Sequence, residues 1–231
     1  MSLFLDSNII IGFSIEVDPW NYYSKRIFEI DKPKFYSTTV KAESKVKIRD
    51  LLFQYNLFFY LIKRDIPKDY ITENEFLKIV TQIKHINGKE FSFDQENIAG
   101  MIWSEGAWFK EANSLEIFKL LDDILDDINE TTFPNFKKCI ASMNLHERKN
   151  SYLGLLNYLK TLKKEHHGET IMIHHPDDEI ILDAHDLASS KGIDLFFISS
   201  DKKLLRFSEE IKNITSITDM FSAEDAFFRV N

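Results

Sequence analysis

Short apolar runs near both ends of the chain lead directly into polar or acidic residues. Residues 3–5 precede Asp6, and residues 195–198 lead through two serines to Asp201. A short continuous apolar run is typical of a strand buried on both faces, as in a parallel sheet. Segments with the 3.6-residue apolar spacing of a helix follow these strands. Strands alternating with helices at both ends predict an α/β fold, with a parallel sheet flanked by helices.

The middle of the chain is predicted to be an enlarged helical insertion. From about residue 51 to 169 nearly every segment has helical spacing, with breaks predicted at residues 86–91 and 130–136. The sheet core is then expected from about residues 1–50 and 170–231. We expect a single domain, because no linker rich in Gly, Pro or Ser divides the chain. The strands expected in this core are at residues 3–5, 34–37, 170–175, 193–201 and 214–218.

Composition supports long helices and limits the classes of function. The 231 residues include only 7 Gly and 5 Pro but 20 Phe, which favours long helices and a filled core over a turn-rich β fold. The formal charge of −8 excludes a broadly basic nucleic-acid clamp, although local basic patches are compatible with it. The single cysteine, Cys139, excludes an intramolecular disulfide and fits a reducing compartment. Because we find neither a signal peptide nor a membrane span, we expect a cytoplasmic protein.

Carboxylates fall at positions where a parallel sheet binds ligands. The carboxyl ends of parallel strands line one edge of the sheet, so Asp6 and Asp201 are expected at the same edge. The helix predicted before the last long strand carries Glu179, Asp183 and Asp186 on one face, because these residues are four and three positions apart. A solvated face is the ordinary explanation of such a group. The strands on either side of this helix favour a second explanation, in which Asp183 points toward the same edge.

Three stretches together resemble the PIN domain, a fold of metal-dependent nucleases that act mainly on RNA. The stretch "LFLDSNIIIG" resembles the first strand of that family with its Asp-(Ser/Thr)-Asn triplet. The stretch "STTVKAE" is similar to the second motif, in which a Ser ends a strand and a Glu follows six residues later. The stretch "DAHDLASSKGIDLFFISSDKKL" resembles the third segment, in which Asp-Ala opens a helix and a strand leads to Ser/Thr-x-Asp. The resemblance implies an acidic quartet and two supporting residues: Asp6, Glu43, Asp183 and Asp201, supported by Asn8 and Ser199.

The chain also departs from the family pattern. Asp186 stands where the family usually has an apolar residue, and we keep it as a supporting candidate. An extra acidic run, Asp177, Asp178 and Glu179, lies just upstream of the third segment, so either Asp178 or Asp183 can be the third acid. The middle of the chain is far longer than in a minimal PIN domain and contains no motif that we can name.

The residue types fit cation-assisted hydrolysis of a phosphodiester. Mg²⁺ and Mn²⁺ prefer carboxylate oxygens and keep several water ligands, so the resemblance implies Asp6, Asp183 and Asp201 as metal ligands. A bound ion would activate a water for in-line attack and stabilise the developing charge. Lys41 and Lys45, beside the glutamate of the second motif, are candidates for contacts with the phosphate backbone.

The resemblance therefore implies a divalent-metal-dependent nuclease, and an endoribonuclease is the favoured form. RNA is the expected partner, and single-stranded DNA is kept as a second candidate substrate. A second copy of the chain or an antitoxin-like protein is a further expected partner. An inactive PIN-like module that binds RNA or a protein through the helical middle stays open as an alternative. A phosphatase that forms an aspartyl-phosphate at Asp6 is the least favoured, because this chemistry commonly needs a carboxylate two residues later, where this chain has Asn8.

Overall fold

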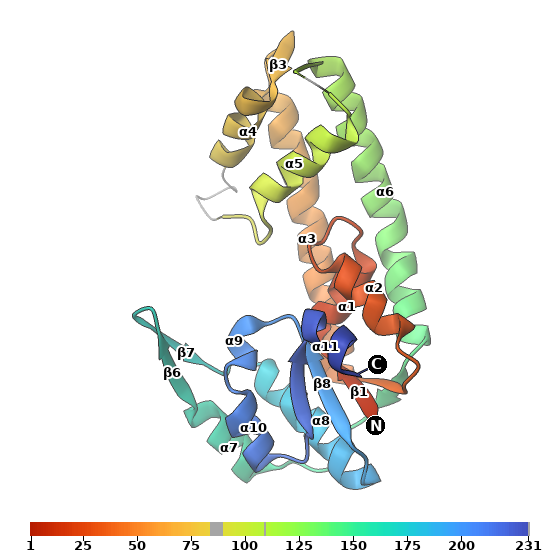
Figure 1. The fold of residues 1–231 in the computed structure, drawn as a ribbon, viewed down its shortest axis with the longest axis vertical. Helices are drawn as coiled ribbons and strands as arrows, with labels where there is room; N and C mark the ends of the chain where they lie inside the picture. Colours follow the sequence, from red (N-terminus) through yellow and green to blue (C-terminus); the bar gives the residue numbers. More distant parts are fainter. Residues whose placement is uncertain (84–89, 109, 231) are drawn as a thin grey trace. The chain divides into compact units, whose positions relative to one another are not determined.

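A five-stranded parallel sheet flanked by helices forms the centre of the fold. The structure is a computed structural model that describes residues 1–83, 90–108 and 110–230. In these ranges the sheet has the order β5-β2-β1-β8-β9, and each pair of neighbouring strands is parallel. Figure 1 labels β1 and β8 of this sheet. Its strands are β1 (Ser2–Leu5), β2 (Lys34–Ser37), β5 (Asn144–His146), β8 (Leu195–Ser199) and β9 (Asp219–Ser222). The prediction of an α/β fold with a parallel sheet is confirmed.

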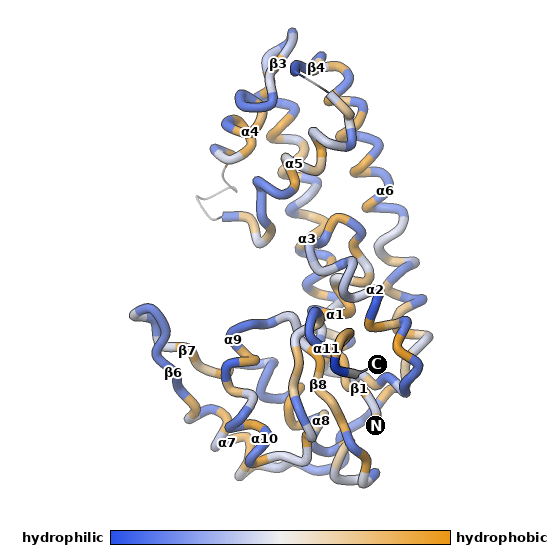
Figure 2. The backbone as a smooth tube through the Cα atoms, viewed as in Figure 1, coloured by the Kyte–Doolittle hydropathy of each residue, from blue (hydrophilic) through white to orange (hydrophobic). Residues whose placement is uncertain are grey.

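The two apolar runs from the ends of the chain pair with each other as β1 and β8. Leu3 lies opposite Phe196 and Leu5 lies opposite Ile198, so the residues that follow both strands emerge at the same edge. All residues of β1 are buried, as expected of a strand covered on both faces. Figure 2 shows hydrophobic residues along both strands.

Helices cover the sheet and connect its strands. α8 (Asp177–Lys191) contacts β2 and β8, and it ends at Gly192, whose φ of 58° is the left-handed conformation that glycine adopts readily after a helix. α1 (Ser7–Ser14) also contacts β8. In the described part of the chain no helix is both long enough and apolar enough to cross a membrane. The other helices around the sheet are α2 (Asn21–Glu29), α7 (Leu153–Thr161), α9 (Lys202–Leu205), α10 (Ser208–Ile214) and α11 (Ala223–Val230).

The chain divides into two compact units. The sheet unit consists of Met1–Val46 and Pro134–Asn231, and the helical unit consists of Lys47–Phe133. Aromatic rings fill the interior of the helical unit, where Tyr55 stacks on Phe93. The elements that lie wholly or partly in this unit are α3 (Thr38–Asp65), β3 (Tyr70–Thr72), α4 (Glu73–Gln82), α5 (Gln95–Glu105), β4 (Glu111–Asn113) and α6 (Ser114–Ala141), with β3 and β4 paired antiparallel.

The edge strand β5 is the main addition to the predicted sheet. It pairs with β2 and comes from the part of the chain that the sequence pattern assigns to the helical insertion of residues 51–169. The strand is only three residues long, and Asn144 and Leu145 are exposed. So short a strand on a sheet edge has no continuous apolar run, and periodicity therefore gives no signal for it.

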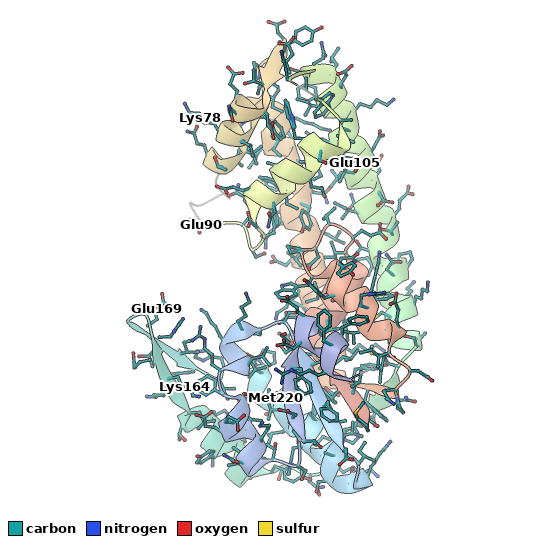
Figure 3. All side chains as sticks on the ribbon, viewed as in Figure 1. Lys78, Glu90, Glu105, Lys164, Glu169 and Met220 are labelled. Atoms are coloured by element: carbon teal, nitrogen blue, oxygen red, sulfur yellow. The ribbon has the colours of Figure 1, made fainter. Side chains whose placement is uncertain are left out.

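Two predicted strands differ from the observed ones. The strand predicted at residues 170–175 forms part of a separate antiparallel hairpin of β6 (Lys163–His166) and β7 (Glu169–Met172), on which Lys164 and Glu169 are labelled in Figure 3. The last strand of the sheet is β9 and not residues 214–218, because α10 continues to Ile214 before the chain becomes extended.

The helix break predicted at residues 130–136 is wrong, because α6 continues through Pro134. A proline inside a helix removes its own N–H as a donor, but it does not end a helix that tertiary packing supports. The buried face of α6 continues across the proline as Ile128, Thr132, Phe136 and Cys139. The other predicted break, at residues 86–91, lies largely outside the described residues.

Candidate active site at the carboxyl edge of the sheet

The hydroxyl group of Ser199 lies between the first and the last of the predicted acids. Ser199 is the final residue of β8 and is fully buried. Its Oγ donates a hydrogen bond of 2.6 Å to Oδ2 of Asp6 and accepts one of 3.0 Å from the backbone N–H of Asp201. Residues that are more than 190 positions apart in the sequence thus meet at one edge of the sheet.

Both acids at this edge also cap helices. Asp6 is the N-cap of α1, and its Oδ1 accepts a 2.6 Å hydrogen bond from the N–H of Ser7. Asp201 is the N-cap of α9, and its Oδ1 accepts hydrogen bonds from the N–H groups of Lys203 and Leu204. Capping places each carboxylate at the positive end of a helix and restricts its rotamer. Asp6 is buried, whereas Asp201 is half-buried.

Asp183 supplies a third carboxylate, from α8, and it is almost completely buried. Burial raises the pKa of this carboxyl group, while the hydroxyls of Ser37 and Thr39 and the charge of Arg148 act in the opposite direction. Ser37 ends β2, the direct neighbour of β1, so Asp183 faces the same edge of the sheet as Asp6. Among the described residues, Oδ2 of Asp183 has no hydrogen-bond partner although it is buried.

Arg148 is a residue of this edge that the sequence does not predict. Its Nη2 donates a hydrogen bond to Glu179, and its Nε lies 3.4 Å from Oδ1 of Asp183. Arg148 follows β5 in the sequence. Because the sequence pattern does not predict β5, it also does not predict that this side chain lies beside the acids. Its neighbour in the sequence, Lys149, is equally basic but exposed.

Asp186 and Asp178, the supporting candidates on α8, are engaged elsewhere. Oδ1 and Oδ2 of Asp186 accept four hydrogen bonds, all from donors in residues 146–152. Burial acts to raise the pKa of Asp186, but these four hydrogen bonds outweigh it and hold the pKa below its ordinary value. Asp178 is buried beside Lys160 at 3.7 Å and His175 at 3.6 Å. Of the two candidates for the third acid, Asp183 is the one that the structure brings to Ser37, at the end of β2.

The second motif lies on the first turns of α3. Glu43 is half-buried there, and the adjacent Ser44 donates to the carbonyl of Val40 and lies 3.5 Å from the carbonyl of Ser7 in α1. This contact brings the start of α3 next to the start of α1. The three remaining candidates differ in exposure: Asn8 is half-buried, whereas Lys41 and Lys45 are exposed.

The donor set has the right chemistry for a hard cation but does not form a closed cage. Among the described residues, no three His, Cys, Asp or Glu side chains come together closely enough to hold a metal ion. Mg²⁺ commonly binds one or two carboxylates and completes its octahedron with water and substrate phosphate, so a cage of three is not required. The unpartnered Oδ2 of Asp183 is an oxygen of the type that such a cation prefers.

Comparison with known proteins identifies no relative: no protein-family model, no curated protein and no solved structure matches the chain.

Proposed function

We propose that the chain is a divalent-metal-dependent nuclease with a PIN-like fold, and that it hydrolyses phosphodiester bonds of RNA at the carboxyl edge of its sheet. The hydrogen bonds of Ser199 to Asp6 and Asp201 carry this proposal, because they join the first and last acids of the three resembling stretches. Asp6 and Asp183 are both buried at this edge. Burial of ionised carboxylates is costly unless their charge is compensated, which a bound cation would do.

Each acid has a distinct proposed role. Asp6 and Asp201 hold Mg²⁺ or Mn²⁺, directly or through water, since each carboxylate is held in place by its own helix cap. The cation, when bound, supplies an activated water and stabilises the negative charge that develops on the phosphate. Asp183 offers its unpartnered Oδ2 as a further ligand, and Glu43 borders the site from α3. Lys41 and Lys45, which are exposed on the same helix, contact the backbone of the RNA or of single-stranded DNA.

A second candidate function is a catalytically inactive module that binds RNA or a protein. The ion pair between Arg148 and Asp183 favours this alternative, because it satisfies part of the acidic charge without a metal ion. An aspartyl-phosphate phosphatase remains the weakest alternative, since Asn8 occupies the position of the second carboxylate that such enzymes commonly use.

The test is cleavage of single-stranded RNA and single-stranded DNA in parallel, with Mn²⁺ or with a chelator. We expect cleavage only with Mn²⁺, and a rate about 100-fold lower for Asp6→Asn, in line with the loss of one group that stabilises transition-state charge. The matched control is Asp31→Asn, which removes an exposed carboxylate before β2, at the opposite edge of the sheet. Equal Mn²⁺-dependent cleavage by Asp6→Asn and the wild type would rule out the assignment, and RNA binding without cleavage would support the inactive module.

A further inference from the structure

The guanidinium group of Arg148 is only partly satisfied by its acidic partners. Nη2 donates to Glu179 and Nε faces Asp183, but Nη1 is buried and has no hydrogen-bond partner among the described residues. Oδ2 of Asp183, in the same ion pair, is also buried and unpartnered. A buried donor or acceptor without a hydrogen-bond partner destabilises the folded state, because it has lost its hydrogen bonds to water. A ligand that presents an anionic oxygen to Arg148 and a cation to Asp183 would satisfy both Nη1 of Arg148 and Oδ2 of Asp183.

A phosphate group with a bound divalent cation provides both an anionic oxygen and a cation. The guanidinium group is planar, carries its N–H donors in a rigid fork and binds phosphate oxygens well. Without a metal, the ionised carboxylates of Glu179 and Asp183 beside Arg148 disfavour a phosphate at this position. A divalent cation at the carboxylates compensates their charge, so phosphate binding at Arg148 is expected to depend on the cation.

The segment that carries Arg148 is held in one conformation. Asp186 accepts hydrogen bonds from the side chains of His146, Asn150 and Tyr152 and from the N–H of Lys149, so donors on both sides of Arg148 converge on one buried carboxylate. Tyr152 has a φ of 47°, a left-handed conformation that is unfavourable for a side chain of this size. Its hydroxyl is fixed by Asp186 at 2.9 Å. A strained residue that its surroundings fix in place is common at binding sites, because the strain holds a neighbouring group ready.

We infer that Arg148, whose side chain is 21% exposed, is a substrate-positioning residue: its guanidinium group donates a hydrogen bond to a phosphate oxygen of the bound nucleic acid when a divalent cation occupies the acidic edge. The inference rests on the proposed nuclease function and adds a residue that neither the sequence motifs nor the acidic quartet contains. Asp186 positions Arg148 through residues 146–152 and does not touch the substrate.

The test separates binding of nucleic acid from binding of the cation. The probe is a fluorescein-labelled ten-residue 2′-O-methyl-uridine oligonucleotide, whose anisotropy is measured in Ca²⁺, a cation with the same preference for oxygen ligands, or in a chelator. Cation binding is measured separately, from the electron paramagnetic resonance signal of free Mn²⁺. The variants are Arg148→Gln and Arg148→Lys, with Lys160→Gln as a control that makes the same change in charge beside Asp178.

We expect the wild type to bind the oligonucleotide only with Ca²⁺. Arg148→Gln weakens this binding about tenfold, because a charge-assisted hydrogen bond is lost, and Arg148→Lys weakens it less. Mn²⁺ affinity of Arg148→Gln is not reduced, and Lys160→Gln binds the oligonucleotide like the wild type. Circular dichroism checks that the variants fold. If Arg148→Gln does not fold, the comparison of Arg148→Lys with the wild type still tests the inference.

Two outcomes would overturn the inference in different ways. If the wild type binds with Ca²⁺ and the arginine variants bind the oligonucleotide equally well, Arg148 is only a counter-ion of the acids; tighter Mn²⁺ binding by Arg148→Gln would accompany this result. The nuclease proposal would survive it. If the wild type shows no Ca²⁺-dependent binding at all, the inference fails, and the Mn²⁺-dependent cleavage assay decides the nuclease proposal separately.

Discussion

At the scale of single residues, the hydroxyl of Ser199 connects the two ends of the chain at the candidate site. It is hydrogen-bonded to both the carboxylate of Asp6 and the backbone N–H of Asp201. The carboxyl ends of β1 and β8 would be adjacent without it, because the register of the strands fixes them. The orientation of the Asp6 carboxylate depends on this hydroxyl together with the cap bond from the N–H of Ser7.

We therefore expect Ser199→Ala to reduce both stability and activity. The free energy of unfolding should fall by about 1–3 kcal/mol, the cost of leaving a buried charged acceptor with one bond fewer. Mn²⁺-dependent cleavage should fall as well, since Asp6 loses one of the hydrogen bonds that orient its carboxylate. Urea unfolding and the cleavage assay measure the two effects. Ser190→Ala, an exposed position on α8, is the control and should change neither; an unchanged cleavage rate in Ser199→Ala would contradict this role.

The buried carboxylate of Asp183 gives a prediction about pH. Burial raises the pKa of Asp183, so the folded state binds the proton more tightly than the unfolded state does. Its contribution to stability is therefore fully present below the unfolded pKa of about 3.9 and is lost as pH rises through the folded pKa. At neutral pH and without metal, Asp183→Asn should thus increase the free energy of unfolding, by about 1 kcal/mol, while it weakens Mn²⁺ binding.

Urea unfolding of wild type and Asp183→Asn at several pH values between 4 and 8 measures this effect. The difference in stability should increase with pH, because only the ionised carboxylate is unfavourable in the buried position. A variant that is less stable than the wild type at pH 8 in the absence of metal would show that the ion pair with Arg148 outweighs burial, and the expectation would be wrong.

At the scale of elements, the connection between β5 and α7 is ordered by one side chain. The four hydrogen bonds to Asp186 fix residues 146–152 against α8, although this connection has no regular secondary structure of its own after β5. The T-shaped contact of the Tyr152 ring with His185 adds to this order. The rigidity of the segment that carries Arg148 thus comes from a helix that is adjacent to it in space but distant in the sequence.

Asp186→Asn should loosen this connection. We expect the free energy of unfolding to fall by about 2 kcal/mol, since the hydrogen bonds of an ionised acceptor are replaced by those of a neutral amide. Because the folded pKa of Asp186 lies below the unfolded value, its contribution is present above the unfolded pKa and is lost as pH falls through the folded pKa. The difference between wild type and variant should therefore disappear in strong acid.

Hydrogen exchange of the backbone amides gives the local measurement for this prediction. Protection should decrease in residues 146–152 of Asp186→Asn and stay unchanged in β1 and β8. Asp194→Asn, an exposed carboxylate just before β8, serves as the control. Unchanged protection of residues 146–152 would show that other contacts order the segment.

At the scale of the whole molecule, the sequence predicts those parts of the fold that have long or continuous apolar patterns. β1, β2 and β8 are short buried runs, and α8 has both a clear periodicity and a terminating Gly192, so their positions follow from local rules. β5 lacks such a run, and α6 passes through Pro134 because packing on one face outweighs a local signal. These two features depend on tertiary contacts that a single sequence does not display.

The residues of the candidate site also fall into those that local sequence patterns predict and those that only tertiary contacts identify. Asp6 and Asp201 follow apolar runs, and that position alone predicts their meeting at the edge of the sheet. The choice between Asp178 and Asp183 cannot be made from helical spacing, since both lie on α8; it needs the contact with Ser37 at the end of β2. Arg148 has no sequence signal at all, because its position depends on β5 and on the hydrogen bonds to Asp186.

The central claim is that the acids from both ends of the chain bind one divalent-cation site. Its most direct test is a titration with Mn²⁺, followed by electron paramagnetic resonance of the free ion, for wild type, Asp201→Asn and the control Asp31→Asn. We predict saturable binding by the wild type and by Asp31→Asn, and an affinity at least about tenfold weaker for Asp201→Asn. Equal binding by all three proteins, or no saturable binding by the wild type, would contradict the claim.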